Sequence, residues 1–434
     1  MLGTGSPVAS LTEAEVGTIC AEFLAREDLA GKRVLGIIPD QTRSGPIDLM
    51  VRTVHDLLEG RAKALDFLIA LGTHPPMSEE AIDRRLGLAP GERAVRYPRT
   101  RFINHQWDQP GQLAQVGTIG AERVAELSAG MMREPVHVTI NRLVFEYDVL
   151  LVVGPTFPHE VVGFSGGNKY LVPGISGPEI IDMFHWLGAL ITSPGIIGTK
   201  YTPVRAVIDT AAAMVPVRKL CMSLVSRGTR LAGLFCGTPE EAWSAAADLS
   251  DRIHIVYKDR PFESVLSCAQ SMYEELWVGG KAAYKLEPVV ADGGELIIYA
   301  PHLTGLSRTH GATIERIGYH VRDYFLGQWA RFADVPRGVI AHSTHVKGVG
   351  TYRDGREEPR VTVTLATGIP EALCRKVNLG YRDPGRIDPE EWDGRECDGR
   401  LRVPHAGEVL YRLRRDPFLG AAGADRAAPR SRGA

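Results

Sequence analysis

Short apolar runs alternate along most of the chain with stretches that repeat apolar residues at helical spacing. The pattern predicts a helix over residues 11–27, a buried strand over 32–39, a helix over 47–58 and a strand over 65–71. A helix from Ser78, strands over 136–140 and 149–153, and a helix after Pro178 continue the series. Alternation of this kind predicts an α/β fold with mostly parallel sheets.

A second series of elements begins near residue 262. It predicts strands over 264–268, 295–299, 338–342 and 360–365, with helices up to about 288 and over 314–327. We therefore expect two α/β domains, over 1–258 and 262–395, with the active site in the cleft between them. Segment 384–398 is interpreted as a connection, and 400–418 is expected to pack back on the first domain. The Ala-, Gly- and Arg-rich stretch 420–434 is expected to be disordered.

Composition narrows the class of protein. A chain of 434 residues with 44% hydrophobic residues can bury the cores of two domains. The 50 basic and 52 acidic side chains leave a net charge of -2, and no basic block is interleaved with aromatic residues, which excludes a typical nucleic-acid binder. The sequence has neither a secretory leader nor an apolar run of about 20 residues, so we expect a cytoplasmic protein without membrane contact. The six cysteines lack C-x-x-C spacing, which argues against a zinc ribbon, an iron–sulfur cluster or a disulfide framework.

Candidate chemistry is densest between residues 155 and 186. The loop Ser165-Gly166-Gly167 offers backbone N–H groups for close approach of an anion, and the Lys169 amine follows at once. His159 precedes this loop and His185 lies on the predicted helix after it. The spacing is not that of a Walker loop. Taken alone, such a turn is more often a tight connection with a solvated lysine, and a lone helix histidine is more often simply packed.

Two further polar segments follow predicted strands. Asp40-Gln41-Thr42-Arg43 comes after the first strand and His74 after the second, and open α/β sheets bind ligands at the carboxyl ends of their strands. Arg43 is suited to bind a carboxylate or a phosphate through two hydrogen bonds. We expect Asp40 to fix the orientation of Arg43. Without the other motifs, a strand-end turn with a surface ion pair would explain this segment equally well.

Taken together, these residues closely resemble the nickel-pincer lactate racemase family, and the resemblance covers most of the chain. It implies a nickel-pincer nucleotide cofactor (pyridinium-3,5-bisthiocarboxylic acid mononucleotide nickel) covalently attached to Lys169, with His185 as the protein ligand to nickel. His74 and His159 would be the acid/base pair, and Arg43 and Lys281 would bind the substrate carboxylate. Further contacts to the cofactor are expected from the backbone and side chains of Asp40, Thr42, Ser165, Gly166 and Gly167.

The reaction that this resemblance implies is inversion of C2 of a small-molecule 2-hydroxy acid by reversible hydride transfer to the cofactor. One position departs from the family, because its glutamine three residues before the lysine is Val278 here. That change puts lactate in doubt as the substrate. A polyhydroxylated acid such as an aldonate would suit the many polar side chains of the C-terminal half, which include Tyr284, His302, His310, His342, His345 and Lys347.

Two other interpretations stay open at this point. His74, His159 and His185 could form a three-histidine zinc or iron site in a hydrolase or dehydratase acting on an organic acid. Alternatively, the chain could bind a nucleotide or an organic acid without catalysis. A metal site at His342 and His345 is less expected, because side chains three residues apart at a strand end point in different directions.

Overall fold

The computed structural model describes residues 1–418, so the tail predicted over 420–434 lies outside the described residues. The described chain forms two compact units, and both are discontinuous in sequence. The first consists of Met1–Phe157, Phe164–Phe184 and Lys200–Ile253. The second consists of Pro158–Gly163, His185–Thr199 and the chain from His254 onward. The prediction of an active-site cleft between the domains stays a prediction.

The first unit is built on a seven-stranded sheet with the order β1-β11-β10-β7-β2-β3-β4. Strands β10, β7, β2, β3 and β4 are parallel, while β11 is antiparallel to β10 and to β1. The strands are β1 (Leu2–Gly5), β2 (Arg33–Pro39), β3 (Ala64–Ala70), β4 (Phe102–Asn104), β7 (Val149–Pro155), β10 (Arg218–Arg227) and β11 (Arg230–Gly237). Its helices are α1 (Glu13–Arg26), α2 (Ile47–Leu58), α3 (Glu79–Arg85), α4 (Glu92–Arg96), α5 (Ala121–Leu127), α8 (Pro203–Ala213) and α9 (Pro239–His254), and β5 (Leu113–Ile119) pairs with β6 (Val136–Asn141) in a separate ribbon.

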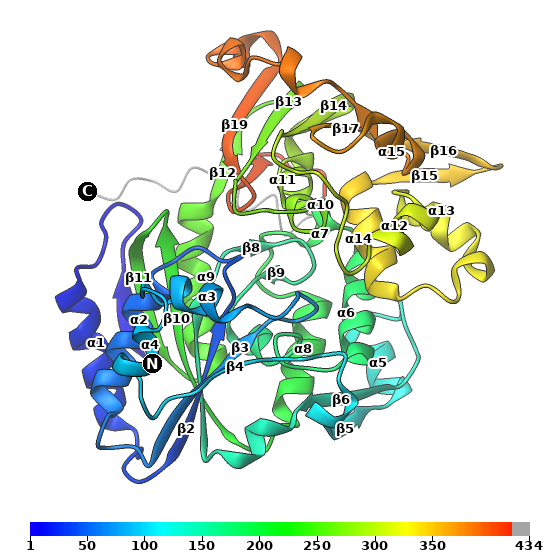
Figure 1. Cartoon of the computed structure of the whole chain (residues 1–434). Helices are drawn as coiled ribbons and strands as arrows, with labels where there is room; N and C mark the ends of the chain where they lie inside the picture. Colours follow the sequence, from blue (N-terminus) through cyan, green and yellow to red (C-terminus); the bar gives the residue numbers. More distant parts are fainter. Residues whose placement is uncertain (419–434) are drawn as a thin grey trace. The chain divides into compact units, whose positions relative to one another are not determined.

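Both faces of this sheet are buried, as expected for parallel strands covered by helices. Figure 1 shows α1 and α2 in blue beside one face. Phe23 of α1 and Met50 of α2 belong to the same core cluster as Ile38 of β2 and Leu151 of β7. Leu35 of β2 points to the opposite face of the sheet and is fully buried as well. Helix α1 begins at a capping box, in which Thr12 and Glu15 each accept a backbone N–H of the other.

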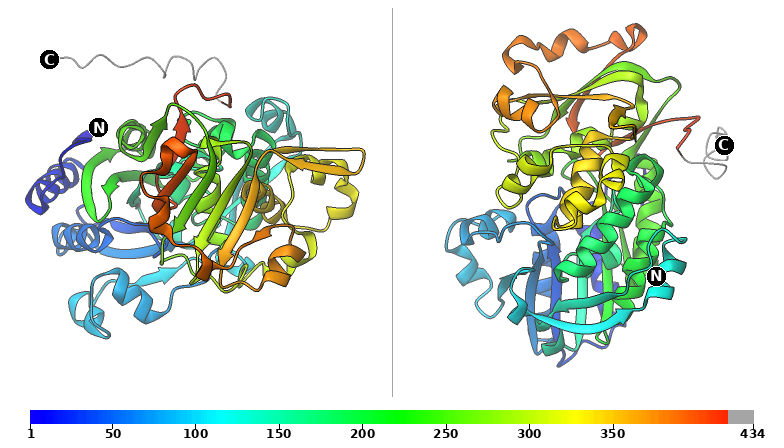
Figure 2. Two further views of the ribbon diagram at one scale, coloured as in Figure 1. Left: turned by 90° about the horizontal axis from the view of Figure 1, so that it is seen from above. Right: turned by 90° about the vertical axis from the view of Figure 1, so that its right-hand side faces the viewer.

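The second unit contains a five-stranded parallel sheet with the order β18-β17-β14-β13-β19, whose strands run side by side in Figure 2. Segment 384–398 is not only a connection, because its Ile387 and Trp392 pack against a core cluster of that sheet. The strands of the sheet are β13 (Phe262–Ala269), β14 (Val290–Ala300), β17 (Thr362–Thr367), β18 (Gly380–Tyr381) and β19 (Arg400–Ala406). Smaller pairs are β8 (Pro158–His159) with β9 (Gly163–Phe164), β12 (Ile255–Lys258) with β20 (Leu410–Leu413), and β15 (Gly350–Arg353) with β16 (Arg356–Pro359). The helices are α7 (Ser193–Ile196), α10 (Leu276–Gly279), α11 (Lys281–Tyr284), the 3-10 turn η4 (Glu287–Val289), α12 (Gly311–Ile317), α13 (Arg322–Gly327), α14 (Arg337–Lys347) and α15 (Glu371–Lys376).

The fold class is confirmed, since both large sheets are mostly parallel and alternate with helices. Three details differ from the sequence-based prediction. Residues 338–342 lie in helix α14 and are not a strand, and the helix expected over 314–327 is divided into α12 and α13. Residues 400–406 form β19 of the second sheet, so they belong to the second unit and not to the first domain as expected. The following strand β20 pairs with β12, which also belongs to the second unit. No helix within residues 1–418 is long and apolar enough to span a bilayer.

Candidate active-site residues in the two units

Three adjacent parallel strands of the first unit end at one edge of its sheet. Asp40 directly follows β2, the His74 loop follows β3, and the loop that contains Lys169 follows β7. The two later loops also touch, because the Gly72 N–H donates to the Gly174 carbonyl at 3.0 Å. The fold therefore brings the motifs of Asp40, His74 and Lys169, which are far apart in sequence, to the same edge.

A short polar contact at this edge joins Asp40 to His74. The His74 Nδ1 lies 2.6 Å from Asp40 Oδ2, while Asp40 Oδ1 accepts the Thr42 hydroxyl at 2.7 Å and the Thr42 N–H at 3.1 Å. Burial by itself would raise the pKa of Asp40, but His74, Arg43 and Thr42 together hold that pKa well below its ordinary value. An ionised Asp40 accepts a proton-bearing Nδ1, which leaves the Nε2 of a neutral His74 as the basic nitrogen.

Arg43 is oriented by Thr42 and not directly by Asp40. Its Nη1 donates to the Thr42 hydroxyl at 2.9 Å and to the Thr42 carbonyl at 3.2 Å, and the guanidinium lies 5.8 Å from the centre of the Phe157 ring. The prediction that Asp40 fixes Arg43 therefore holds only through the hydroxyl between them. Sequence analysis missed the direct partner of Asp40, His74, because 34 residues separate the two.

The loop Ser165-Gly166-Gly167 is stabilised by hydrogen bonds of its own residues. The Ser165 hydroxyl donates to the Pro155 carbonyl and accepts the Phe157 N–H at 3.1 Å, so its contacts lie within the loop. Gly166 and Gly167 have φ of 89° and 59°, and a Cβ at Gly166 would lie 2.2 Å from the Thr156 hydroxyl oxygen. The positive φ angles and the close packing by themselves require glycine here.

Two buried side chains from later in the chain brace the same loop. Arg205 donates to the Phe164 and Gly166 carbonyls, and Trp243 donates to the Ser165 carbonyl at 2.9 Å. The Arg205 guanidinium lies 4.1 Å from the Trp243 ring centre, a distance at which a cation–π contact is favourable. The loop is therefore rigid around Lys169.

Lys169 fits a covalently tethered group. It is the only residue between 149 and 177 that is not buried, so its side chain has a path out of an otherwise enclosed segment. The buried hydroxyl of Thr156, beneath the loop, has no hydrogen-bond partner within residues 1–418. A rigid loop with one partly exposed amine is the arrangement that a lysine-linked cofactor needs.

Arg85, at the end of α3, was not singled out from the sequence. Its Nε and Nη2 are buried and make no hydrogen bond within the described chain. Burial lowers the pKa of Arg85, and the nearby Asp40 and Tyr170 oppose that effect. A second guanidinium therefore lies in the electrostatic neighbourhood of Asp40 and Arg43, where an anionic group would be favoured.

In the second unit, His159 lies beside Glu160. The Nδ1 of His159 accepts the Val161 N–H at 3.2 Å and is 3.4 Å from Glu160 Oε2. Glu160 is buried, and its Oε1 accepts the Tyr284 hydroxyl at 3.1 Å. Sequence analysis missed Glu160, although a carboxylate adjacent to a candidate acid/base histidine is a signal that could have been noticed.

Lys281 begins helix α11 and is buried in the second unit. Its Nζ lies 5.6 Å from the centre of the Tyr273 ring, and its charge acts on Glu160. Val278, where the resemblance noted in the sequence leads us to expect glutamine, is also buried. The substitution therefore replaces a hydrogen-bonding side chain in the interior of this unit by an apolar one.

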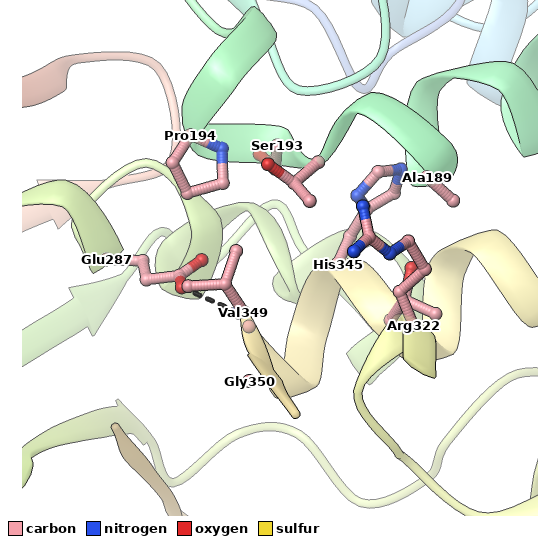
Figure 3. A pocket seen from close by; sticks show the side chains of 11 residues that line it. Ala189, Ser193, Pro194, Glu287, Arg322, His345, Val349 and Gly350 are labelled. Carbon is pink, nitrogen blue, oxygen red and sulfur yellow. Dashed lines mark hydrogen bonds between the residues drawn. The ribbon is translucent and has the colours of Figure 1, made fainter. Parts of the chain in front are cut away.

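His185 is partly exposed on helix α6 (Pro178–Ile191), between the buried residues Phe184 and Trp186. One turn further along the same helix, Ala189 lines a cavity of about 60 Å³ within the second unit (Figure 3). Ser193, Glu287 and His345 also face the cavity, and their Oγ, Oε2 and Nε2 atoms have no hydrogen-bond partner within residues 1–418. Burial raises the pKa of Glu287 and lowers that of His345 to about 4.

The predicted pair His342 and His345 lies on α14. His342 stacks on Trp277 with ring centres 4.1 Å apart, and its Nε2 is 3.0 Å from the Trp277 carbonyl oxygen. Burial lowers the pKa of His342 to about 3, so packing explains this side chain. Residues 1–418 contain no group of three or more His, Cys, Asp and Glu side chains placed to hold a metal ion.

Comparisons with known proteins identify relatives for this architecture. The model of the lactate racemase N-terminal domain matches residues 18–195. Lactate racemase of Thermoanaerobacterium thermosaccharolyticum is 25% identical over 290 residues, and the match covers 63% of this chain and 61% of that enzyme. The chain therefore spans less than two thirds of the length of that relative.

Two solved structures are similar over most of the chain. A crystal structure of a Thermotoga maritima protein has a TM-score of 0.86 and 34% identity, covering 94% of this chain and all of the other. The apoprotein of the Thermoanaerobacterium thermosaccharolyticum lactate racemase has a TM-score of 0.67 and 17% identity, covering 91% and 93%, which shows a common fold. Residues 18–195 therefore match the lactate racemase N-terminal domain family, and the chain as a whole has a fold similar to that of a lactate racemase.

Proposed function

We propose that this protein is an isomerase, a racemase or epimerase that inverts C2 of a 2-hydroxy acid. The observation that carries the proposal is the Asp40–His74 contact at 2.6 Å, on the same strand edge as the loop of Lys169. Inversion at a carbinol carbon needs a base for the hydroxyl proton, and a histidine whose Nδ1 is held by an ionised carboxylate is such a base.

The cofactor of this proposal is a nickel-pincer nucleotide on Lys169, with His185 as the ligand to nickel. When bound, it would accept a hydride from C2 and return it to either face of the resulting 2-oxo acid. His74 would remove the hydroxyl proton through Nε2 while Asp40 holds Nδ1, and His159 would serve the opposite face. Arg43 and Lys281 would bind the carboxylate, with Arg43 oriented by Thr42.

A polyhydroxylated substrate such as an aldonate is the finer part of the proposal. The cavity beyond Ala189 supports it, because Ser193, Glu287 and His345 each present an unpartnered polar atom there. Hydroxyl groups both donate and accept hydrogen bonds, so they match this mixture of groups. Val278, by contrast, removes a polar contact that a small substrate would use.

Intact-mass spectrometry of protein produced together with the enzymes of cofactor synthesis tests the proposal. We expect an adduct of cofactor size that is lost in Lys169→Ala and kept in Lys200→Ala, since Lys200 is a control lysine that pairs with Asp248 of α9 at 2.8 Å. His185→Ala should keep the adduct and lose nickel by metal analysis. Assays with lactate, malate, 2-hydroxyglutarate, phenyllactate and gluconate, read by chiral detection, identify the substrate. Isomerisation by Lys169→Ala at the normal rate would refute the proposal.

A further inference from the structure

The two candidate acid/base histidines have different partners at Nδ1. The Nδ1 of His74 faces the carboxylate of Asp40 at 2.6 Å, so that nitrogen carries a proton. The Nδ1 of His159 instead accepts the Val161 N–H at 3.2 Å, so in a neutral His159 the proton resides on Nε2. A neutral histidine with its proton on Nε2 cannot act as a base through that nitrogen. His159 therefore needs a second arrangement in order to work.

Glu160 supplies the group for that arrangement. Its Oε2 is buried, has no hydrogen-bond partner within the described chain, and lies 3.4 Å from His159 Nδ1. Its Oε1 is already engaged by the Tyr284 hydroxyl at 3.1 Å. A buried carboxylate oxygen without a donor is costly unless a donor reaches it at some stage of function. Because Nδ1 lies 3.2 Å from the Val161 nitrogen and 3.4 Å from Glu160 Oε2, a small rotation of the His159 ring would exchange the Val161 contact for one with Glu160.

Charges around Glu160 keep it ionised inside the second unit. Burial by itself would raise the pKa of Glu160, but Lys281 and Lys285, with smaller effects of its own backbone N–H and of His345, lower that pKa below its ordinary value. Lys281 and Tyr284 are the first and last residues of α11, three positions apart and so on one side of the helix, and Lys285 is its C-cap. Helix α11 and its C-cap thus supply one hydroxyl in contact with this carboxylate and two ammonium groups whose charges act on it, of which that of Lys285 also donates to the Glu408 carbonyl.

We propose that Glu160 is the positioning residue of His159 and accepts the Nδ1 proton of His159 in a hydrogen bond in the catalytically competent state. The inference rests on the proposed function, because it assumes that His159 exchanges a proton with the substrate hydroxyl. In that state, the Nε2 of a neutral His159 carries a lone pair, and an Nε2–H of the protonated ring can be returned to the substrate. Glu160 thereby serves His159 as Asp40 serves His74, but only after the Val161 contact has been given up.

Nitrogen-15 NMR of histidine-labelled holoenzyme, free and saturated with substrate, reads the tautomer of His159 directly, with His159→Gln to assign its signals. We expect wild-type Nδ1 to change from unprotonated to protonated on saturation. In Glu160→Gln, Nδ1 should stay unprotonated, and kcat should fall by about 10- to 100-fold with KM changed by less than threefold, as for loss of a charge-assisted hydrogen bond. Glu160→Asp should recover part of kcat.

Glu357→Gln is the matched control, since Glu357 pairs with another histidine of the second unit, His320, at 2.8 Å. It should leave the His159 signals and kcat unchanged. If Glu160→Gln fails to fold, Tyr284→Phe decides, because it removes only the donor to Oε1 and should lower kcat by about 2- to 10-fold. Unchanged His159 signals together with kcat within twofold of wild type, in whichever of the two variants folds, would overturn the inference. Loss of the Lys169 adduct in wild type would instead contradict the proposed function.

Discussion

Replacement of Asp40 by asparagine is the sharpest perturbation of the first unit. The Thr42 N–H and hydroxyl both donate to Asp40 Oδ1, at 3.1 and 2.7 Å. In Asp40→Asn the amide oxygen must stay on that side, because an NH₂ group there would face two donors. The NH₂ group would then face His74 and donate to its Nδ1, which forces the His74 proton onto Nε2. The substitution therefore removes the base while it conserves the shape of the side chain.

The size of this effect follows from the contact that is lost. A hydrogen bond to a charged group contributes about 1.5–3 kcal/mol, equivalent to about 10- to 150-fold in rate. The wrong tautomer adds to that loss, and the corresponding substitution in serine proteases lowers kcat by about 10⁴-fold. We expect kcat of Asp40→Asn to fall by at least tenfold, with a smaller change in KM.

The assay is isomerisation by holoenzyme with chiral detection, together with nitrogen-15 NMR of the His74 ring. Asp66→Asn is the control, since Asp66 is another buried carboxylate of the first unit and accepts the Arg101 N–H at 2.7 Å. It should lower stability and leave kcat of the folded protein unchanged. An Asp40→Asn enzyme that keeps kcat within twofold, with the His74 proton still on Nδ1, would refute the reasoning.

Three further predictions concern stability. The pKa of Asp40 is depressed in the folded state, so its contribution to stability is complete above about pH 4 and is lost as the pH falls through the lower folded pKa. The free energy of unfolding of Asp40→Asn should therefore depend less on pH below about 4 than that of wild type. Equal acid sensitivity of both proteins would contradict this. Asp416→Ala removes the carboxylate that lies 2.6 Å from the buried Arg412 guanidinium, so the free energy of unfolding measured with denaturant should fall by about 3–5 kcal/mol. A decrease below about 1 kcal/mol would show that the pair is not buried in solution. Gly167→Ala, at a φ of 59° and with a Cβ 2.7 Å from the Trp243 side chain, should lower the melting temperature, while Gly17→Ala on α1, where nothing lies within 4 Å, should raise it slightly.

Much of the first unit could be predicted from local sequence. Helix α2 occupies residues 47–58 as expected, because its apolar residues repeat at helical spacing on one buried face. Strands β2, β3 and β7 are short apolar runs that end in polar motifs, so their positions and the candidate residues after them followed from the pattern. The hairpin of β10 and β11 was not predicted, because its two strands are buried and carry no alternating pattern.

The second unit was harder to predict for a physical reason. Residues 339–347 of α14 are all buried, so this part of the helix has no solvent-exposed face, and the short apolar run at its start was interpreted as a strand. The pairing of Asp40 with His74 and the contact of Tyr284 with Glu160 join residues 34 and 124 positions apart. Such contacts depend on tertiary structure, which local patterns do not encode.

The interleaving of the two units has a consequence for how the protein matures. The segments with His159 and His185 belong to the second unit, yet its sheet is complete only when β19 pairs with β13, after residue 406 has been synthesised. Neither unit can be obtained by cutting the gene at a single position. During translation, all residues of the first unit, Asp40, His74 and Lys169 among them, have been synthesised by residue 253, whereas the surroundings of His159 and His185 form only after β19 has been synthesised.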